Sequence, residues 1–222
     1  MAVAYIGSAH GVGTSASVDT TGATLLVMAL VYDGSITVSD SKGNTWTALT
    51  ERVNSGGTKV RIYYSTGANL TSVGSGHTFT TSLSYGRVIG AAFSGTGAYE
   101  AEATASDSGF TVNAVNAGSL TPSENGCLLV AITNFGNTTN TFAIDSGYAL
   151  PQAQTGVSGI SYGGGLGYLI QSTAGAVNPQ FTWGGSAVRA EGAHAVFKSS
   201  GGGGGSTQPP RSMYLNRLRR AA

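Results

Sequence analysis

The chain has 222 residues, 35 of them glycine, and only 9% of its residues are Asp, Glu, Lys or Arg, with a formal net charge of +1. This length suits one large all-β domain or two small ones. Wholly disordered chains combine low hydrophobicity with a high net charge, so the near-neutral balance and the 41% hydrophobic share predict a folded body. The single cysteine, Cys127, excludes an internal disulfide and is expected to be a buried small hydrophobe.

Strand signals follow one another along the chain. Runs rich in Val, Ile, Thr, Tyr and Phe alternate with Gly, Asn, Asp and Ser, as in all-β proteins. They predict a first series of strands at 2–8, 14–19, 23–32, 35–40, 45–53, 58–65, 76–82 and 86–94. A second series is predicted at 99–105, 109–115, 126–134, 140–145, 147–154, 159–171, 178–183 and 187–198. The apolar runs Leu25–Val31 and Leu128–Ile132 are typical of central strands that are covered on both faces.

The two series repeat each other. Four segments match in the same order: 24–30 with 127–133 at an offset of 103, 65–68 with 172–176, 79–81 with 181–183 at an offset of 102, and 90–93 with 192–197. A repeat of about 100 residues with seven or eight strands is enough for a β-sandwich of the jelly-roll or immunoglobulin-like kind. We therefore predict two tandem duplicated sandwich units, residues 1–97 and 98–200. One larger sandwich that shares strands between the halves is the alternative.

The C-terminal segment differs from everything before it. Residues 1–200 hold seven Lys or Arg and ten Asp or Glu, whereas residues 201–222 hold four arginines and no acid. Five glycines and a Pro-Pro pair predict a flexible linker over 201–210. Residues 211–222 are predicted to be a basic docking peptide that forms about two helical turns only when bound. Its anchoring residues are Arg211, Met213, Tyr214, Leu215, Arg217, Leu218, Arg219 and Arg220.

Two other interpretations of this segment stay open. An unstructured end, or an engineered glycine linker, would have the same composition. Contact with nucleic acid is the weaker interpretation, because four arginines without a basic body make a poor electrostatic footprint.

No motif in the chain identifies a reaction. The three histidines, His10, His77 and His194, lack the spacing of a metal site, and the acids are not clustered as calcium requires. Glu100 and Glu102 would face the same side of one strand, whereas the two carboxylates of a glycosidase usually come from different strands. We therefore predict a protein that is not an enzyme and that uses no metal or cofactor.

Aromatic residues are the candidates for a binding surface. Core packing is the default role of such residues, but Trp46, Tyr162 and Trp183 are candidates for stacking on a sugar ring. A hydroxyl-rich, weakly charged surface would suit a neutral polysaccharide. The N-terminal residues lack the basic and apolar regions of a secretory signal, and no run approaches the ~20 apolar residues of a membrane helix. We expect no signal peptide, no transmembrane segment and no membrane partner.

A pattern of turns and strands resembles a known group of proteins. The sequence Val38-Ser-Asp-Ser-Lys-Gly-Asn-Thr-Trp-Thr-Ala-Leu49 precedes Val60-Arg-Ile-Tyr-Tyr-Ser-Thr66, and Gly90-Ala-Ala-Phe-Ser-Gly95 follows. With this pattern, residues 1–200 resemble the Gly/Ser/Thr-rich β-sandwich proteins of tailed-phage virions, of the decoration, head-fibre or adhesin type.

The resemblance implies a structural accessory protein of a virion, synthesised in the host cytoplasm. Such a protein would bind capsid or other virion proteins and form a homo-oligomer or a symmetric array. The alternative is a carbohydrate-binding module or adhesin whose partner is a host glycan.

Overall fold

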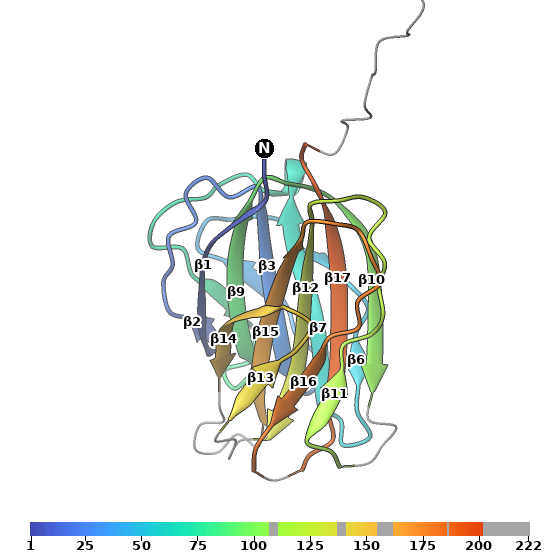
Figure 1. Cartoon of the computed structure of the whole chain (residues 1–222). Coiled ribbons are helices and arrows are strands. Elements are labelled where there is room, and N and C mark those ends of the chain that lie inside the picture. Colours follow the sequence, from blue (N-terminus) through green and yellow to red (C-terminus); the bar gives the residue numbers. More distant parts are fainter. Residues whose placement is uncertain (107–110, 137–140, 155–161, 186, 202–222) are drawn as a thin grey trace, which may run out of the picture.

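The structure is a computed structural model, and it describes residues 1–106, 111–136, 141–154, 162–185 and 187–201. These residues form an almost purely β-sheet protein, with one short 3-10 turn at Gly67–Asn69 (Figure 1). The first unit contains β1 (Ala4–Val12), β2 (Thr14–Ser15), β3 (Leu25–Tyr32), β4 (Val38–Asp40), β5 (Thr47–Ala48), β6 (Arg52–Val53), β7 (Lys59–Thr66), β8 (Phe79–Thr81) and β9 (Arg87–Ser94). The second unit contains β10 (Thr96–Ser106), β11 (Ala114–Asn116), β12 (Cys127–Gly136), β13 (Phe142–Ile144), β14 (Ala149–Gln154), β15 (Tyr162–Gln171), β16 (Gln180–Trp183) and β17 (Glu191–Ser199).

The predicted all-β sandwich is confirmed, and every predicted strand range overlaps a strand of the structure. The predicted strand 45–53 is divided into β5 and β6, which both pair with β7. The strands β3 and β12 are buried on both faces, as their unbroken apolar sequences predict.

The two units have the same strand order. The central sheet runs β1-β9-β3-β7-β5 in the first unit and β10-β17-β12-β15-β14 in the second. A smaller outer layer runs β2-β8-β4 in the first unit and β11-β16-β13 in the second. In the first unit β2 also pairs with β1, so the outer and central strands form one nine-stranded sheet, whereas the second unit has two separate sheets. Among the described residues, no strand of one unit pairs with a strand of the other, so the alternative of one sandwich with shared strands is not what the structure shows. The chain is thus a tandem duplication in topology as well as in sequence.

Strand register supports three of the four sequence matches. Leu25 pairs with Phe93 in the first unit, and Leu128 pairs with Phe197 in the second. The matched phenylalanines Phe79 and Phe181 are both fully buried in the outer layer of their unit.

The fourth match, between residues 65–68 and 172–176, is wrong. Leu26 pairs with Ser65 on β7, and the equivalent Leu129 pairs with Leu169 on β15, so the match of Ser65 with Ser172 is three positions too late. Small polar residues recur so often in this chain that a short Ser-Thr-Gly-Ala match arises without structural equivalence.

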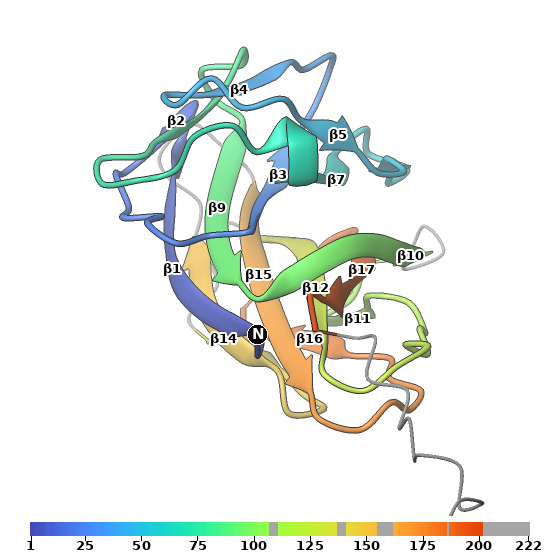
Figure 2. The same cartoon turned by 90° about the horizontal axis from the view of Figure 1, so that it is seen from above.

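Each unit is a sandwich with its own core, and a third core joins the units. In the first unit the outer layer packs on one face of the central sheet through a cluster centred on Phe79, Leu26 and Met28. In the second unit the corresponding cluster is centred on Phe181 and Leu129. The other faces of the two central sheets pack against each other, so the molecule has four layers of β-structure (Figure 2).

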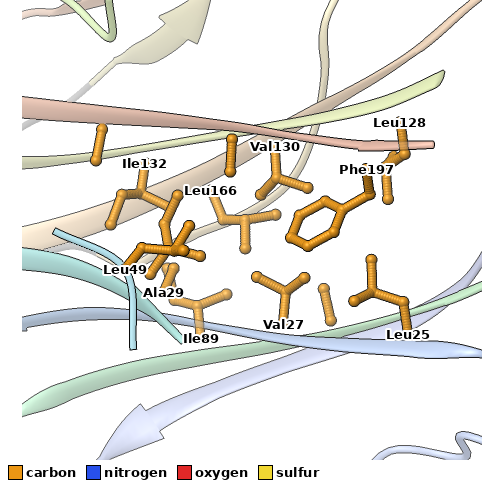
Figure 3. Close-up of a cluster of buried hydrophobic side chains, with 14 of the residues drawn as sticks. Leu25, Val27, Ala29, Leu49, Ile89, Leu128, Val130, Ile132, Leu166 and Phe197 are labelled. Carbon is orange, nitrogen blue, oxygen red and sulfur yellow. The ribbon is translucent and has the colours of Figure 1, made fainter. Parts of the chain in front are cut away.

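The core between the units is made of apolar side chains from both central sheets. Figure 3 shows Val27, Ile89 and Leu25 of the first unit opposite Val130, Leu166 and Phe197 of the second. Burial of aliphatic and aromatic side chains stabilises such a contact by roughly 1.5–3 kcal/mol for each fully buried side chain. The two sandwiches are therefore fastened into one body, although the division at residues 97 and 98 as folding domains stays a prediction.

A single glycine joins the units. The strand β9 ends at Ser94 and β10 begins at Thr96, with Gly95 between them at a φ of +68°. A Cβ at Gly95 would lie 2.1 Å from the carbonyl oxygen of Ala2, so both the backbone angle and the close approach require glycine. The backbone oxygen of Gly95 also accepts a hydrogen bond from the backbone N–H of Ser200, at 2.7 Å.

Candidate functional site

A buried polar cluster in the first unit brings together residues that are far apart in the chain, among them Asp40 at the end of β4. The imidazole of His77 forms a hydrogen bond with Thr20 Oγ1 through Nδ1, at 2.9 Å, and its Nε2 lies 3.4 Å from Asp40 Oδ1. The Asp40 carboxylate also accepts hydrogen bonds from Trp46 Nε1 and from the backbone N–H of Lys42, both at 2.7 Å. Burial alone would raise the pKa of Asp40, but the donors around it hold that pKa below its ordinary value.

The order hydroxyl, imidazole, carboxylate is also the order of groups in an activated nucleophile. Here the side chains of Thr20, His77 and Asp40 are all fully buried, and the His77 ring is stacked on Phe79 at 4.7 Å. A substrate could not reach the Thr20 hydroxyl in this arrangement. The cluster therefore stabilises the outer layer by holding Thr20, Asp40 and His77 together. The sequence analysis did not predict it, because its members are far apart in the chain.

His194 has a second buried polar environment, in the core of the second unit. Its Nδ1 donates to the carbonyl oxygen of Gly118 at 2.9 Å, so its Nε2 accepts from the hydroxyl of Tyr148. Burial lowers the pKa of His194 to about 4, against a smaller opposing effect of the Gly118 carbonyl. Burial also raises the pKa of Tyr148, helped by the nearby charge of Asp145. Both side chains are thus neutral near pH 7 and serve as a matched donor and acceptor inside the core.

The acidic residues of β10 do not form a pair. The register of β10 against β17 shifts between Tyr99 and Ala101, so Glu100 and Glu102 point to different sides, contrary to the sequence expectation. Glu100 accepts a hydrogen bond from the backbone N–H of Ser123 at 2.8 Å, within its own unit. Glu102 accepts from the backbone N–H and the hydroxyl of Thr50, at 2.9 and 2.8 Å, and so joins the two units.

Other polar groups at the unit interface also hold the two halves together. His10 on β1 contacts the side-chain amide of Gln152 on β14. Asn54 of the first unit donates to the carbonyl oxygen of Arg189 of the second, at 3.1 Å. Within the described ranges, no group of three or more His, Cys, Asp or Glu side chains is placed to hold a metal ion.

The three aromatic residues proposed for sugar stacking lie in different settings. Trp46 packs edge-on against Phe79 at 5.9 Å and donates its indole N–H to Asp40, so it belongs to the outer layer of the first unit. Tyr162 is the first residue of β15, and its side chain is outside the described part. Trp183 is the last residue of β16, 5% exposed, in the outer layer of the second unit. The structure does not bring Trp46 and Trp183 together in one platform.

A hollow of about 280 Å³ lies beside Trp183. Its lining residues come from β13 and β16 and the positions next to them: Thr141, Phe142, Ala143, Thr182, Trp183 and Gly184. No lining residue carries a charge. The indole Nε1 of Trp183 is buried and has no hydrogen-bond partner within the described residues.

The two ends of the described chain meet at one pole of the molecule. A Cβ built on Gly201 would lie 3.1 Å from the backbone nitrogen of Met1, and Figure 1 shows the N-terminus beside the end of β17. Of the predicted linker 201–210, residues 202–210 lie outside the described part of the chain, and so do all the predicted anchoring residues. The anchoring residues predicted from the sequence are Arg211, Met213, Tyr214, Leu215, Arg217, Leu218, Arg219 and Arg220.

Comparison of the chain with protein-family models, with curated proteins and with solved structures found no match. The described residues contain no helix with the length and hydrophobicity needed to cross a membrane.

Proposed function

We propose that the protein is a structural accessory component of a virion, anchored to the particle by its C-terminal peptide and displaying the fused pair of sandwiches. The observation that carries the proposal is the position of the chain ends. Met1, Gly95 and Gly201 gather at one pole, so a tether that continues from Gly201 leaves the opposite pole and the flanks of the sandwiches free. This is the geometry that a displayed module needs.

The charge distribution of the chain supports the same function. The ten acids and seven basic residues before residue 201 leave the body slightly acidic, whereas the segment after it is purely basic. A basic peptide on a glycine linker can reach an acidic partner without disturbing the folded body. Its arginines would form charge-assisted hydrogen bonds with carboxylates of a capsid or another virion protein. Repetition on a symmetric particle would multiply weak individual contacts.

The fused body supports a mechanical role. Its units are held by an apolar core and by hydrogen bonds such as those of Thr50 with Glu102, so the display element is stiff. The wholly buried Thr20–His77–Asp40 cluster gives no accessible nucleophile, which favours a binding or structural role over an enzymatic one.

The test is co-sedimentation with purified tailed-phage capsids that lack the protein. Full-length protein, a 1–200 fragment and a variant with Arg211, Arg217, Arg219 and Arg220 changed to Gln are compared. We expect the full-length protein alone to sediment with the particles. Equal sedimentation of all three proteins would place the attachment surface on the sandwiches, and no sedimentation of any protein with any particle would contradict the virion function.

A further inference from the structure

The corner between β9 and β10 places the two units face to face. Figure 2 shows the chain turning from β9 into β10, and Gly95 makes this turn with a φ of +68°. Thr96, the next residue, donates its backbone N–H to the hydroxyl of Thr24 in the first unit, at 3.0 Å. Because the linker is a single residue, the backbone angles at Gly95 decide whether the two units of one chain can face each other.

The contact between the units is made by residues that are far from this corner in the chain. Its apolar core contains side chains from both central sheets, such as Val27 opposite Val130. Its polar contacts include the hydrogen bond from the side-chain amide of Asn54 to the carbonyl oxygen of Arg189, at 3.1 Å. These contacts do not require that both units belong to the same chain. The first unit of one copy would fit the second unit of another copy in the same way.

The internal core of each unit does not involve this contact. The cluster around Phe79 and the cluster around Phe181 lie between a central sheet and its outer layer, on the face turned away from the other unit. A chain whose corner is straightened would therefore expose one apolar sheet face on each unit. Contiguous exposed apolar surface favours association, and a second copy in the same state offers the complementary faces.

We propose that two copies of this chain exchange units through a hinge at Gly95. In the exchanged dimer Gly95 is extended, and the first unit of each copy packs on the second unit of the other copy. The dimer has the same contacts between units as two monomers, so the two states differ chiefly at the hinge. Exchange of this kind is a low-cost route to a symmetric dimer, and short hinges favour it. The inference does not depend on the proposed virion function.

Glycine at position 95 favours the closed monomer in dilute solution. It adopts a positive φ at no steric cost, whereas a Cβ there would lie 2.1 Å from the carbonyl oxygen of Ala2. Closure within one chain also proceeds at a high effective concentration. Opening requires separation of the apolar core between the units, so the protein concentration during folding selects monomer or dimer.

The first experiment refolds the full-length protein from urea at low and at high protein concentration. Light scattering after size-exclusion chromatography measures the mass. We expect a monomer at low concentration, and at high concentration a dimer that persists after dilution. A protein that refolds only to the monomer at every concentration overturns the proposal.

A substitution at the hinge and a matched control test the role of Gly95. Gly95→Val cannot keep the closed corner without strain, so we expect its dimer fraction to exceed that of the unsubstituted protein severalfold at the same concentration. Gly22→Val is the control, because Gly22 also has a positive φ, of +81°, and no atom lies within 4 Å of an added Cβ. Its dimer fraction should equal that of the unsubstituted protein. Equal dimer fractions in the two variants contradict a hinge at Gly95.

A cross-linking experiment identifies which chain contributes each unit, and it does not need the hinge variant to fold. The hydroxyl of Thr50 in the first unit donates to Glu102 in the second, at 2.8 Å, and the native Cys127 is buried. Copies with Thr50→Cys and copies with Glu102→Cys are refolded together at high concentration under reducing conditions, and a short thiol cross-linker is then added. We expect a cross-linked dimer from the mixture and not from either variant alone. Dimers that form without this cross-link associate through other surfaces and overturn the exchange.

Discussion

Tyr99 occupies in the second unit the position that Tyr5 occupies in the first. Tyr5 pairs with Phe93 and Tyr99 pairs with Phe197, and a shift of register follows each tyrosine. Each tyrosine stacks on a tyrosine of the opposite unit. The ring centroids of Tyr5 and Tyr168 are 4.9 Å apart, and those of Tyr99 and Tyr64 are 5.5 Å apart.

The two stacks are related by the duplication itself. Tyr64 pairs with Val27 on β3, and Tyr168 pairs with Val130 on β12, at the equivalent positions of the two units. The interface between the units is therefore a pseudo-twofold contact of the kind found in symmetric dimers, made within one chain.

This relationship predicts equal effects of two distant substitutions. Tyr64→Leu and Tyr168→Leu each remove one stack between the units and should each lower the free energy of unfolding by about 1–2 kcal/mol. The two stacks share no ring, so the effects should add in the double variant. Urea denaturation measures all three values. A large loss for one variant with none for the other would contradict the pseudo-symmetric interface.

Gly95, which joins the two units, predicts a large loss of stability when it is replaced by alanine. Gly95→Ala places a Cβ 2.1 Å from the carbonyl oxygen of Ala2 and keeps a φ of +68°, so the backbone around the joint must move. Gly22→Ala is the control, because Gly22 has a φ of +81° and no atom within 4 Å of an added Cβ. We expect a cost of about 1–2 kcal/mol for the control, from the backbone angle alone, and a clearly larger cost for Gly95→Ala. Thermal denaturation of both variants measures the two losses of stability. Equal losses would show that the contact with Ala2 is unimportant.

The buried His194 predicts a loss of stability in mild acid. Its pKa is about 4 in the folded protein and about 6.5 in the unfolded chain, so the unfolded state binds a proton first as the pH falls. The stabilisation is complete above about pH 6.5 and is lost as the pH falls from about 6.5 to about 4, by up to ~3 kcal/mol. In the His194→Gln variant the free energy of unfolding should depend less steeply on pH across this range. Equal slopes for the two proteins would contradict a neutral buried imidazole.

The buried polar cluster of Thr20, His77 and Asp40 predicts that the Asp40 carboxylate stabilises the first unit. Asp40→Asn replaces an acceptor oxygen by an amide that donates, so either the Trp46 indole or the backbone N–H of Lys42 loses its partner. We expect a loss of about 1–3 kcal/mol, the usual cost of a buried polar group without a partner. Asp19→Asn is the control, since Asp19 is exposed and, within the described part of the chain, accepts side-chain and backbone hydrogen bonds from Thr21, two residues further on. A loss no larger than that of the control, in urea denaturation, would show that the cluster contributes nothing.

Several features of the fold could be predicted because they depend on local patterns. The alternation of polar and apolar residues, and the turn residues between them, mark strands whatever their partners are. The match of residues 79–81 with 181–183 predicted equivalent positions in the two units, and Phe79 and Phe181 are both buried in the core of their unit. The substitution of Trp183 for Thr81 between the repeats was readable in the same alignment.

The sequence by itself determined the strands, their repetition, and the difference in charge between the body and the C-terminal segment. Only the tertiary structure decided that the two central sheets pack face to face, because β3 and β12 are apolar on both faces and the sequence does not say what covers each face. It also decided that Glu100 and Glu102 diverge, since a bulge in β10 depends on the pairing with β17 and not on the spacing of the acids. The gathering of Thr20, His77 and Asp40 was likewise decided by loop packing, since contacts over such long sequence distances arise only when the outer layer closes over the core.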